Sequence, residues 1–215
     1  MLAKPTKTYI TAHSGCEGTP DNSMEHVRAA VASGAEILEI DVRSRDGVLY
    51  LWHDEKADPF GDGCVLFSDF LDELKKTPAV RVNCDMKTDG LAAAVMEEAA
   101  KRDMKEQILF TGSCIGEEKI INELGGEFWH GIWEPEEFEP ALAACLENGT
   151  KVMNLPCKFV DAERKARFDA LGLGFSCWTA NSEAELRRLL ELGIYNITTR
   201  KPVLALKLRK EIQGE

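Results

Sequence analysis

Two carboxylates stand two residues apart in the segment of residues 36–42, which reads Glu-Ile-Leu-Glu-Ile-Asp-Val. Residues i and i+2 of a β-strand share a face, so Glu39 and Asp41 point to one side and Leu38 and Ile40 to the other. Two like charges in a low-dielectric interior repel each other unless a cation neutralises them. Oxygen ligation suits Mg²⁺ or Ca²⁺ better than zinc. The pair predicts a divalent-metal site, and the alternative is a solvated strand edge.

The next polar strand, Val-Asn-Cys-Asp-Met-Lys over residues 82–87, repeats this pattern. Asn83, Asp85 and Lys87 share one face of it. Adjacent strands lie about 5 Å apart, so Asp85 is predicted to add a third carboxylate to the same ion. Lys87, near the end of the strand, is predicted to contact a bound phosphate.

Two of the four histidines end predicted strands, in Ala-His-Ser-Gly at His13 and Trp-His-Asp at His53. Imidazole titrates near neutral pH, so such a pair can divide the roles of general acid and general base. Which histidine is the base is left open. His26, on the first predicted helix, is interpreted as a surface residue, and His130 as structural.

The elements that position these residues alternate regularly along the chain. Strands are predicted at residues 9–12, 37–42, 80–86, 108–111, 128–133, 151–155, 174–178 and 195–198, with a hairpin strand at 48–52 after the turn Arg45-Asp46-Gly47. Helices are predicted from near Ser23 to Gly34 and at residues 68–76, 88–102 (capped by Thr88), 116–124, 135–147, 161–171, 182–192 and 202–212.

Strict alternation of strands and helices implies a parallel sheet, and eight units can close into a (β/α)8 TIM barrel, here with an extra hairpin strand after the second strand. A doubly wound open sheet is the competing fold. The 215 residues fit a single domain, 1–215, slightly short of the roughly 250 of a typical barrel. In either fold the chemistry belongs at the C-terminal ends of the strands.

The composition limits the classes of partner and the location that we expect for the protein. A net charge of −11 argues against nucleic acid and against an anionic membrane surface. No apolar stretch approaches the roughly 20 residues of a membrane span, and no apolar signal region precedes the first strand. The seven cysteines form no C-x-x-C pair, which favours reduced thiols and a cytoplasmic location. The oligomeric state is not predicted.

Residues 13–54 resemble the signature of the glycerophosphodiester phosphodiesterases, which runs His-Arg-Gly, Pro-Glu-Asn-Thr, Gly-Ala-Asp, Glu-x-Asp-Val, Asp-Gly and His-Asp. The chain has, in the same order and spacing, His13-Ser14-Gly15, Pro20-Asp21-Asn22-Ser23, Gly34-Ala35-Glu36, Glu39-Ile40-Asp41-Val42, Asp46-Gly47 and His53-Asp54. Further on, residues 83–87, 178–181 and 193–202 are similar to the family's Asn-x-Glu-x-Lys, Trp-Thr-x-Asn and Gly-x-x-x-Ile-x-Thr-Asp-x-Pro.

This resemblance implies a (β/α)8 barrel that hydrolyses a small-molecule phosphodiester, such as glycerophosphocholine, to an alcohol and a phosphomonoester. The matching positions would make His13 and His53 catalytic and Lys87 a phosphate contact. They would also make three carboxylates the ligands of a divalent metal ion, Mg²⁺ or Ca²⁺, at Glu39, Asp41 and Asp85.

Three departures from the family pattern bear on the substrate. Asp85 replaces the usual Glu, as in the related spider-venom-type phospholipases D. Ser14 replaces an Arg and removes a bidentate phosphate donor. Arg200 replaces an Asp and is predicted either to supply a substitute guanidinium or to be a solvated loop residue. Trp178 is predicted to form an apolar wall for the glycerol or headgroup, or else to be a core residue.

Three other functions stay open. A catalytically impaired barrel could bind a phosphorylated ligand. A phospholipase D-like lyase could use the substrate's own hydroxyl in place of water and form a cyclic phosphate. An unrelated barrel enzyme, such as a metal-dependent aldolase or isomerase, would have to use Lys87. The short stretch from Asp54 to Ser68 predicts an open substrate pocket.

Overall fold

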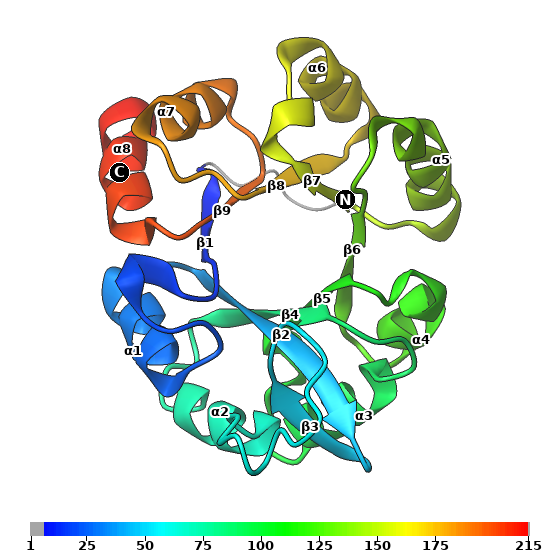
Figure 1. Ribbon diagram of the computed structural model, residues 1–215. Coiled ribbons are helices and arrows are strands. Elements are labelled where there is room, and N and C mark those ends of the chain that lie inside the picture. Colours follow the sequence, from blue (N-terminus) through cyan, green and yellow to red (C-terminus); the bar gives the residue numbers. More distant parts are fainter. Residues whose placement is uncertain (1–6, 215) are drawn as a thin grey trace.

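Eight parallel strands close into a barrel in the computed structural model, which describes residues 7–214 (Figure 1). The strand order is β1-β9-β8-β7-β6-β5-β4-β2-β3, and pairing of β1 with β2 closes the ring. Among the strands within residues 7–214, the antiparallel strand β3 pairs only with β2 and lies outside the barrel. The predicted (β/α)8 barrel with an extra hairpin strand is therefore confirmed, and the open sheet is excluded.

The observed strands are β1 (Tyr9–Ala12), β2 (Ile37–Arg45), β3 (Val48–Leu51), β4 (Arg81–Met86), β5 (Ile108–Gly112), β6 (Glu127–Gly131), β7 (Val152–Pro156), β8 (Gly174–Trp178) and β9 (Asn196–Thr199). The helices are α1 (Met24–Ser33), α2 (Phe67–Leu74), α3 (Ala92–Ala100), α4 (Glu118–Glu123), α5 (Phe138–Asn148), α6 (Ala162–Leu171), α7 (Glu183–Leu192) and α8 (Pro202–Gln213).

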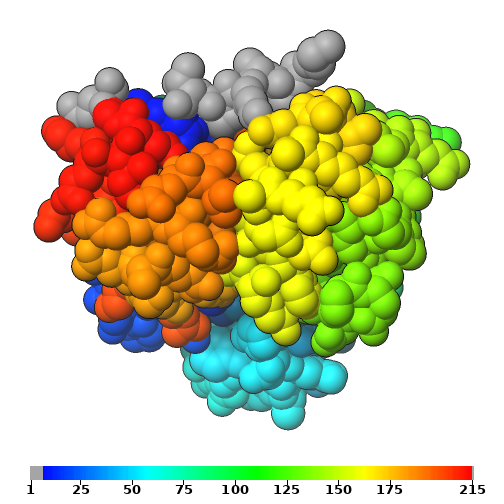
Figure 2. All heavy atoms as spheres, turned by 90° about the horizontal axis from the view of Figure 1, so that it is seen from above, coloured from blue at the N-terminus to red at the C-terminus, as the bar shows by residue number. Residues whose placement is uncertain are grey.

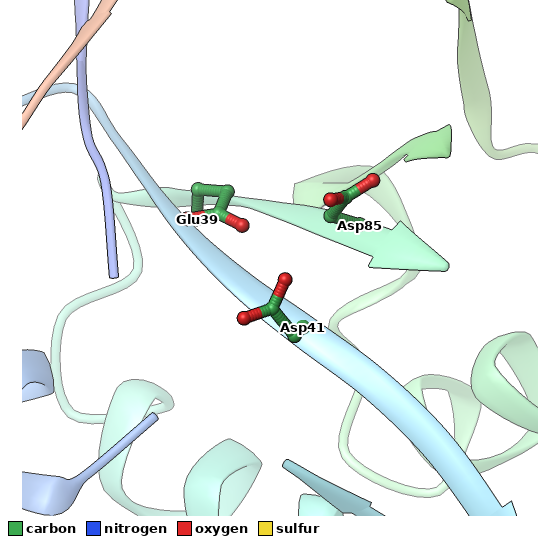
Figure 3. Close-up of side chains that lie close together, drawn as sticks. All are labelled: Glu39, Asp41 and Asp85. Atoms are coloured by element: carbon green, nitrogen blue, oxygen red, sulfur yellow. The ribbon is translucent and has the colours of Figure 1, made fainter. Parts of the chain in front are cut away.

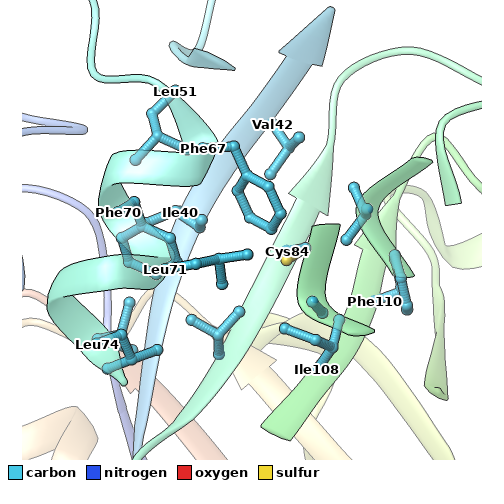
Figure 4. Close-up of a cluster of buried hydrophobic side chains, with 14 of the residues drawn as sticks. Ile40, Val42, Leu51, Phe67, Phe70, Leu71, Leu74, Cys84, Ile108 and Phe110 are labelled. Carbon is cyan, nitrogen blue, oxygen red and sulfur yellow. The ribbon is translucent and has the colours of Figure 1, made fainter. Parts of the chain in front are cut away.

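The strands divide their side chains between a helix-facing layer and the barrel interior. The alternate residues of β2, namely Leu38, Ile40 and Val42, belong to one apolar cluster with the buried face of α2. Figure 4 shows part of this cluster, with Phe67 and Phe70 of α2 beside the strands. Because the apolar residues of β2 face the helices, its carboxylates face the interior, as the period-two pattern predicts.

The interior is layered. Near the N-terminal ends of the strands it is apolar, with Ile37, Leu109, Trp129 and Val152 in one buried cluster. A hydrogen-bonded polar layer includes Asn196, which contacts Thr11 at 2.8 Å and Ser176 at 2.9 Å. The carboxylates of Glu39, Asp41 and Asp85 lie further toward the C-terminal ends. The barrel is therefore filled below the site and open at the end where chemistry is expected.

The predicted cap of the third helix is wrong. Helix α3 begins at Ala92, four residues after Thr88. Gly90 intervenes with φ of 81°, a conformation that does not continue a helix. The Glu117 carboxylate accepts hydrogen bonds from the backbone amides of Gly90 at 2.8 Å and Ala92 at 2.9 Å. A side chain from the next βα unit thus replaces the local cap.

All seven cysteines are free thiols, as expected, with the Sγ atoms of Cys157 and Cys177 3.2 Å apart in the core. None of the helices within residues 7–214 is long and apolar enough to span a bilayer. Residues 1–6, which carry most of the argument about a signal region, lie outside the described part of the chain.

His26 is buried, and its interpretation as a surface residue is wrong. Ser23 caps α1 by accepting a hydrogen bond from the His26 amide, and Gly34 ends the helix at φ of 85°, in agreement with the predicted bounds. The His26 side chain is 0% exposed, and its Nε2 lies 3.0 Å from the backbone oxygen of Glu39. A carbonyl only accepts, so Nε2 carries the proton and ties α1 to β2.

This burial predicts a pH-dependent stability. Desolvation lowers the pKa of His26 from 6.5 to about 4 in the folded protein. Below pH 6.5 the unfolded chain takes up a proton that the folded chain excludes, so this stability is present above pH 6.5 and is lost as the pH falls toward 4. Between pH 7 and 4.5 the loss should be roughly 2 kcal/mol.

Urea unfolding of the wild type and of His26→Gln at both pH values measures the contribution of His26 to the pH-dependent free energy of unfolding. Gln retains a donor for the Glu39 carbonyl but has no charge to gain. The variant should therefore lose about 2 kcal/mol less stability than the wild type over the same interval. Equal losses in the two proteins would show that His26 is not the responsible group.

Candidate active site

A cavity of about 440 Å³ opens at the C-terminal ends of the barrel strands. Eight of the nine predicted site residues line it, and Ser14 does not. The lining set is His13, Glu39, Asp41, His53, Asp85, Lys87, Trp178 and Arg200. Its size falls within the range of small-molecule sites.

Three carboxylates converge on one side of this cavity (Figure 3). Strand register explains the arrangement, since Glu39 and Asp41 alternate along β2 and Asp85 lies directly opposite Asp41 on β4. One oxygen from each of the three lies within 4.8 Å of the others. Burial, and then repulsion from Asp41 and Asp85, raises the pKa of Glu39 well above its ordinary value. The all-oxygen set fits a hard divalent cation, which would relieve this repulsion.

Backbone and amide donors fix two of the carboxylates. The Ser14 amide donates to Glu39 Oε2 at 2.8 Å. Asn22 Nδ2 donates to Asp41 Oδ2 at 2.7 Å, and Asn22 Oδ1 accepts from the Asp41 amide at 2.9 Å. Asn22 is buried at φ of 53°, a left-handed conformation that Asn tolerates. Its position in the family motif was the only sequence signal for this bracing role.

The third carboxylate is braced from β5. The Thr111 hydroxyl lies 2.9 Å from Asn83 Oδ1 and 3.2 Å from Asp85 Oδ1. Gly112 has φ of 83°, and a Cβ there would collide with the Asp85 side chain and the backbone of Met86. Glycine at this position therefore leaves room for Asp85.

Lys87 forms ion pairs with two of the three carboxylates. Its Nζ lies 2.9 Å from Asp41 Oδ1 and 2.6 Å from Asp85 Oδ2. Burial alone would lower the pKa of Lys87, but the Asp85 and Asp41 carboxylates outweigh it and raise the pKa above its ordinary value. One ammonium cannot balance three ionised carboxylates, so the group retains an attraction for a second cation.

His13 is held as a hydrogen-bond acceptor toward the cavity. Its Nδ1 lies 2.8 Å from the Ser14 carbonyl oxygen, so the proton is on Nδ1 and Nε2 keeps a lone pair. Burial lowers the pKa of His13 despite the opposing effect of the Ser14 carbonyl. A neutral imidazole with a free Nε2 is suited to accept a proton.

His53 lies at the cavity rim, with its side chain 65% exposed. Its Nδ1 is 2.9 Å from Asp54 Oδ1, and this hydrogen bond lowers the pKa of Asp54. Arg43 Nε donates to the His53 carbonyl oxygen at 3.0 Å and holds the backbone. Figure 2 shows the following segment, in cyan, projecting beyond the helices at one end of the molecule.

Ser14 lies beneath the site and does not face the cavity. It is 1% exposed, and its Oγ accepts a hydrogen bond from the Asn22 amide at 2.7 Å. The hydroxyl is therefore directed at the loop that braces Asp41. The geometry gives the predicted phosphate contact from Ser14 no support.

Arg200 extends from the end of β9 to the cavity. Its Nη2 lies 3.2 Å from the Asp21 carboxylate, and its amide donates to Asn181 Oδ1 at 2.8 Å. Gly15 has φ of 75°, and a Cβ there would collide with Asp21 and lie 3.3 Å from Arg200 Nη1. The guanidinium thus packs over the His-Ser-Gly turn, close to the position from which the family's Arg is missing.

The opposite wall of the cavity includes Trp178, together with Trp133 and Asn154, which the sequence interpretation missed. The single polar residue in the apolar run of β7, Val-Met-Asn-Leu-Pro, was an available signal for Asn154. His130 is 7% exposed, lies outside the cavity lining and contacts Phe128 with ring centroids 5.8 Å apart.

Comparison with known proteins agrees with this fold. The model of the glycerophosphoryl diester phosphodiesterase family matches residues 13–112. A glycerophosphodiester phosphodiesterase of Bacillus altitudinis is 25% identical, over 96% of this chain and 100% of its own length. Over these residues the chain is similar to the glycerophosphodiester phosphodiesterase family.

Solved structures match at the level of the fold. The glycerophosphodiester phosphodiesterase of Thermotoga maritima superposes with a TM-score of 0.78 at 20% identity, covering 94% of this chain and 98% of that one. An Oleispira antarctica phosphodiesterase, solved with the product sn-glycerol-3-phosphate, gives 0.79 at 15% identity, with coverage of 94% and 96%.

Proposed function

We propose that this protein is a metal-dependent phosphodiesterase that hydrolyses a small-molecule glycerophosphodiester to an alcohol and a phosphomonoester. The observation that carries the proposal is the convergence of three carboxylates, a lysine and two histidines on one cavity. The family supplies the reaction class, and the Oleispira antarctica protein's bound product supplies the glycerophosphate part of the substrate.

The metal ligands would be Glu39, Asp41 and Asp85. A bound Mg²⁺ or Ca²⁺ would supply positive charge to the non-bridging phosphate oxygens. Lys87 would add a second positive charge at the same oxygens, since its Nζ already lies between Asp41 and Asp85.

The two histidines would divide the proton transfers. His13, neutral and with Nε2 free, would take the proton from the attacking group, which is water or a hydroxyl of the substrate. His53, whose Nδ1 is oriented by Asp54, would give a proton to the departing alkoxide. Attack by water yields the phosphomonoester, whereas attack by the substrate's own hydroxyl yields a cyclic phosphate.

Phosphorus NMR of glycerophosphocholine turnover in Mg²⁺ or Ca²⁺ tests this function and both histidine roles. The wild type should release glycerol 3-phosphate. His13→Ala and His53→Ala should each lower kcat by roughly 10²–10⁴, and the double variant by much less than the product, because the two residues act in linked steps. Bis(p-nitrophenyl) phosphate, with its good leaving group, should restore most of the rate of His53→Ala but not of His13→Ala.

His130→Gln is the matched control, since His130 is buried outside the cavity. Its rate should stay within about twofold of the wild type. If cyclic phosphate is the sole product, the reaction is that of a lyase and the proposed hydrolysis is wrong. Binding of the diester without turnover under either ion would favour the impaired, ligand-binding barrel.

We further propose that Arg200 replaces the family's Arg as a phosphate contact. A guanidinium offers parallel donors to phosphate oxygens, and in the part of the chain that the structure describes its ion pair is with the partly exposed Asp21. Arg200→Ala should raise KM for glycerophosphocholine about tenfold with a smaller change in kcat, because it removes a charged hydrogen bond.

Arg200→Lys keeps the positive charge but loses the two parallel donors of the guanidinium. Its KM should therefore lie between those of the wild type and Arg200→Ala. Arg187→Ala, at a partly exposed site on α7, is the control and should leave KM unchanged. An unaltered KM in Arg200→Ala would assign Arg200 to the solvated loop.

A further inference from the structure

Two free thiols lie in contact on the helix-facing side of the barrel wall. The Sγ atoms of Cys157 and Cys177 are 3.2 Å apart, and both residues belong to the apolar cluster that covers β7 and β8. Cys177 is 0% exposed, whereas Cys157, at the start of the turn after β7, is 4% exposed. Neither residue lines the cavity at the C-terminal ends of the strands, so the reaction proposed above does not use them.

The pairing of two adjacent strands brings these thiols together. In the register of β7 with β8, Cys177 is the Cα partner of Leu155. Cys157 follows Leu155 by two residues, a spacing that keeps two side chains of an extended segment on one face. Trp178, the residue after Cys177, is directed into the cavity instead. The backbone of both strands therefore holds the two sulfur atoms against each other.

A positive charge lies beside this pair of thiols. Arg188 of α7 donates from Nη2 to the Cys157 carbonyl oxygen at 3.0 Å and from Nη1 to the Val160 carbonyl oxygen at 2.7 Å. Burial raises the pKa of the Cys177 thiol, and the charge of Arg188 acts in the opposite direction. A cation near a thiol favours the thiolate, which is the form that reacts with oxidants.

The segment between the two cysteines, which are 20 residues apart in the sequence, carries helix α6 on the outside of the barrel (Figure 1). The buried residue of α6 is Phe168, whose ring stacks on Phe175 of β8 with the centroids 3.9 Å apart. Leu171, at the end of the helix, is 42% exposed. An element with few buried apolar residues opens at a low free energy, so a covalent link across its two ends would stabilise it.

We propose that Cys157 and Cys177 are a site of reversible oxidation, at which a peroxide converts the two thiols to a disulfide that links β7 to β8 and encloses α6. A disulfide bond is about 2 Å long, so the sulfur atoms have to approach each other by roughly 1 Å. This movement is within the thermal motion of an ordered side chain. The inference is independent of the proposed phosphodiesterase function, because it involves no residue of the cavity.

The reaction balances with one molecule of hydrogen peroxide as the oxidant. The Cys157 thiolate attacks a peroxide oxygen, the O–O bond breaks, and a sulfenic acid and hydroxide form. The proton lost from the Cys157 thiol converts this hydroxide to water. The Cys177 sulfur then attacks the sulfenic sulfur, the S–O bond breaks, and the Cys177 proton leaves with the hydroxide as a second water. The two thiols lose two electrons, which reduce the peroxide.

The burial of the two residues sets the order of these steps. Cys157 reacts first, because it is the more exposed of the two and begins a turn at the surface of the barrel. Cys177 needs no access to the oxidant, since its sulfur already contacts Cys157. A resolving thiol in contact with the sulfenic acid forms the disulfide before further oxidation to sulfinic acid.

Peptide mapping of the oxidised full-length protein tests the site. The reduced protein is treated with hydrogen peroxide, the remaining thiols are alkylated in denaturant, and the digest is analysed by mass spectrometry. We expect a cross-linked pair of peptides that contain Cys157 and Cys177 and that dithiothreitol separates. Persistence of both thiols under conditions that oxidise the partly exposed Cys64 would overturn the inference. Sulfinic acid in place of the cross-link, or a disulfide between other cysteines, would also overturn it.

Thermal unfolding tests the effect of the link on stability. A cross-link that closes a loop of about 20 residues restricts the unfolded chain. The oxidised wild type should therefore melt about 5–10 °C above the reduced wild type, and dithiothreitol should reverse the change. An unchanged or lower melting temperature in the cross-linked protein would overturn the inference.

Cys157→Ser and Cys177→Ala each remove one sulfur and should abolish both the cross-link and the rise in melting temperature. Cys145→Ala is the matched control, because Cys145 is a buried residue of α5 in the same apolar cluster, and it should retain both. Should Cys177→Ala fail to fold, Cys157→Ser and the mapping of the wild type decide the question. A rise in melting temperature that survives in Cys157→Ser would overturn the inference.

Discussion

Mutual repulsion among three carboxylates in a partly buried site is the constraint on which the rest of this active site depends. Glu39 and Asp41 are 4% and 3% exposed and share the site with Asp85. Their repulsion in a medium of low dielectric would destabilise the fold if no positive charge were near. Lys87 supplies one charge, and a divalent cation is the remaining source that the oxygen-only donor set fits.

The barrel makes this arrangement possible by fixing the carboxylates on rigid strands. The register of β2 with β4 sets Asp41 beside Asp85, and the loop before α1 supplies Asn22 to hold Asp41 on both its amide and its carboxylate. Beneath the site, His26 ties α1 to the carbonyl oxygen of Glu39. The same residues that complete the fold around β1 and β2 therefore also orient the groups that would bind the metal.

Period-two alternation made much of this predictable. It places Glu39, Asp41 and Asp85 inside the barrel because a strand exposes alternate residues to opposite faces, and this holds in any closed parallel sheet. Sequence rules for helix caps failed where a residue distant in sequence supplied the cap. Thr88 does not cap α3, because Glu117 from the following unit binds the free amides and Gly90 turns the chain.

The direction of individual side chains was the feature hardest to predict from the sequence. His26 lies one helical turn before the buried Ala30, so the face of α1 was a signal for its burial, but the polar side chain suggested the surface. Arg200 and Asn154 reach the cavity from β9 and β7, which are distant in sequence from the segment that carries Glu39, Asp41 and Asp85. They approach the cavity because the barrel closes. The alternation of residues along a strand does not by itself show which strands lie across the closed barrel from each other.

Calorimetric titration of the chelator-treated protein with Mg²⁺ and with Ca²⁺ tests the central claim most directly. The account predicts one bound ion per chain, with affinity at least about tenfold weaker in Asp85→Asn, which removes one ligand charge. Asp103→Asn, at a left-handed turn position that Asn also tolerates, should bind as the wild type does. Absence of binding by the wild type, or equal affinity in Asp85→Asn, would contradict the claim that these carboxylates form a metal site.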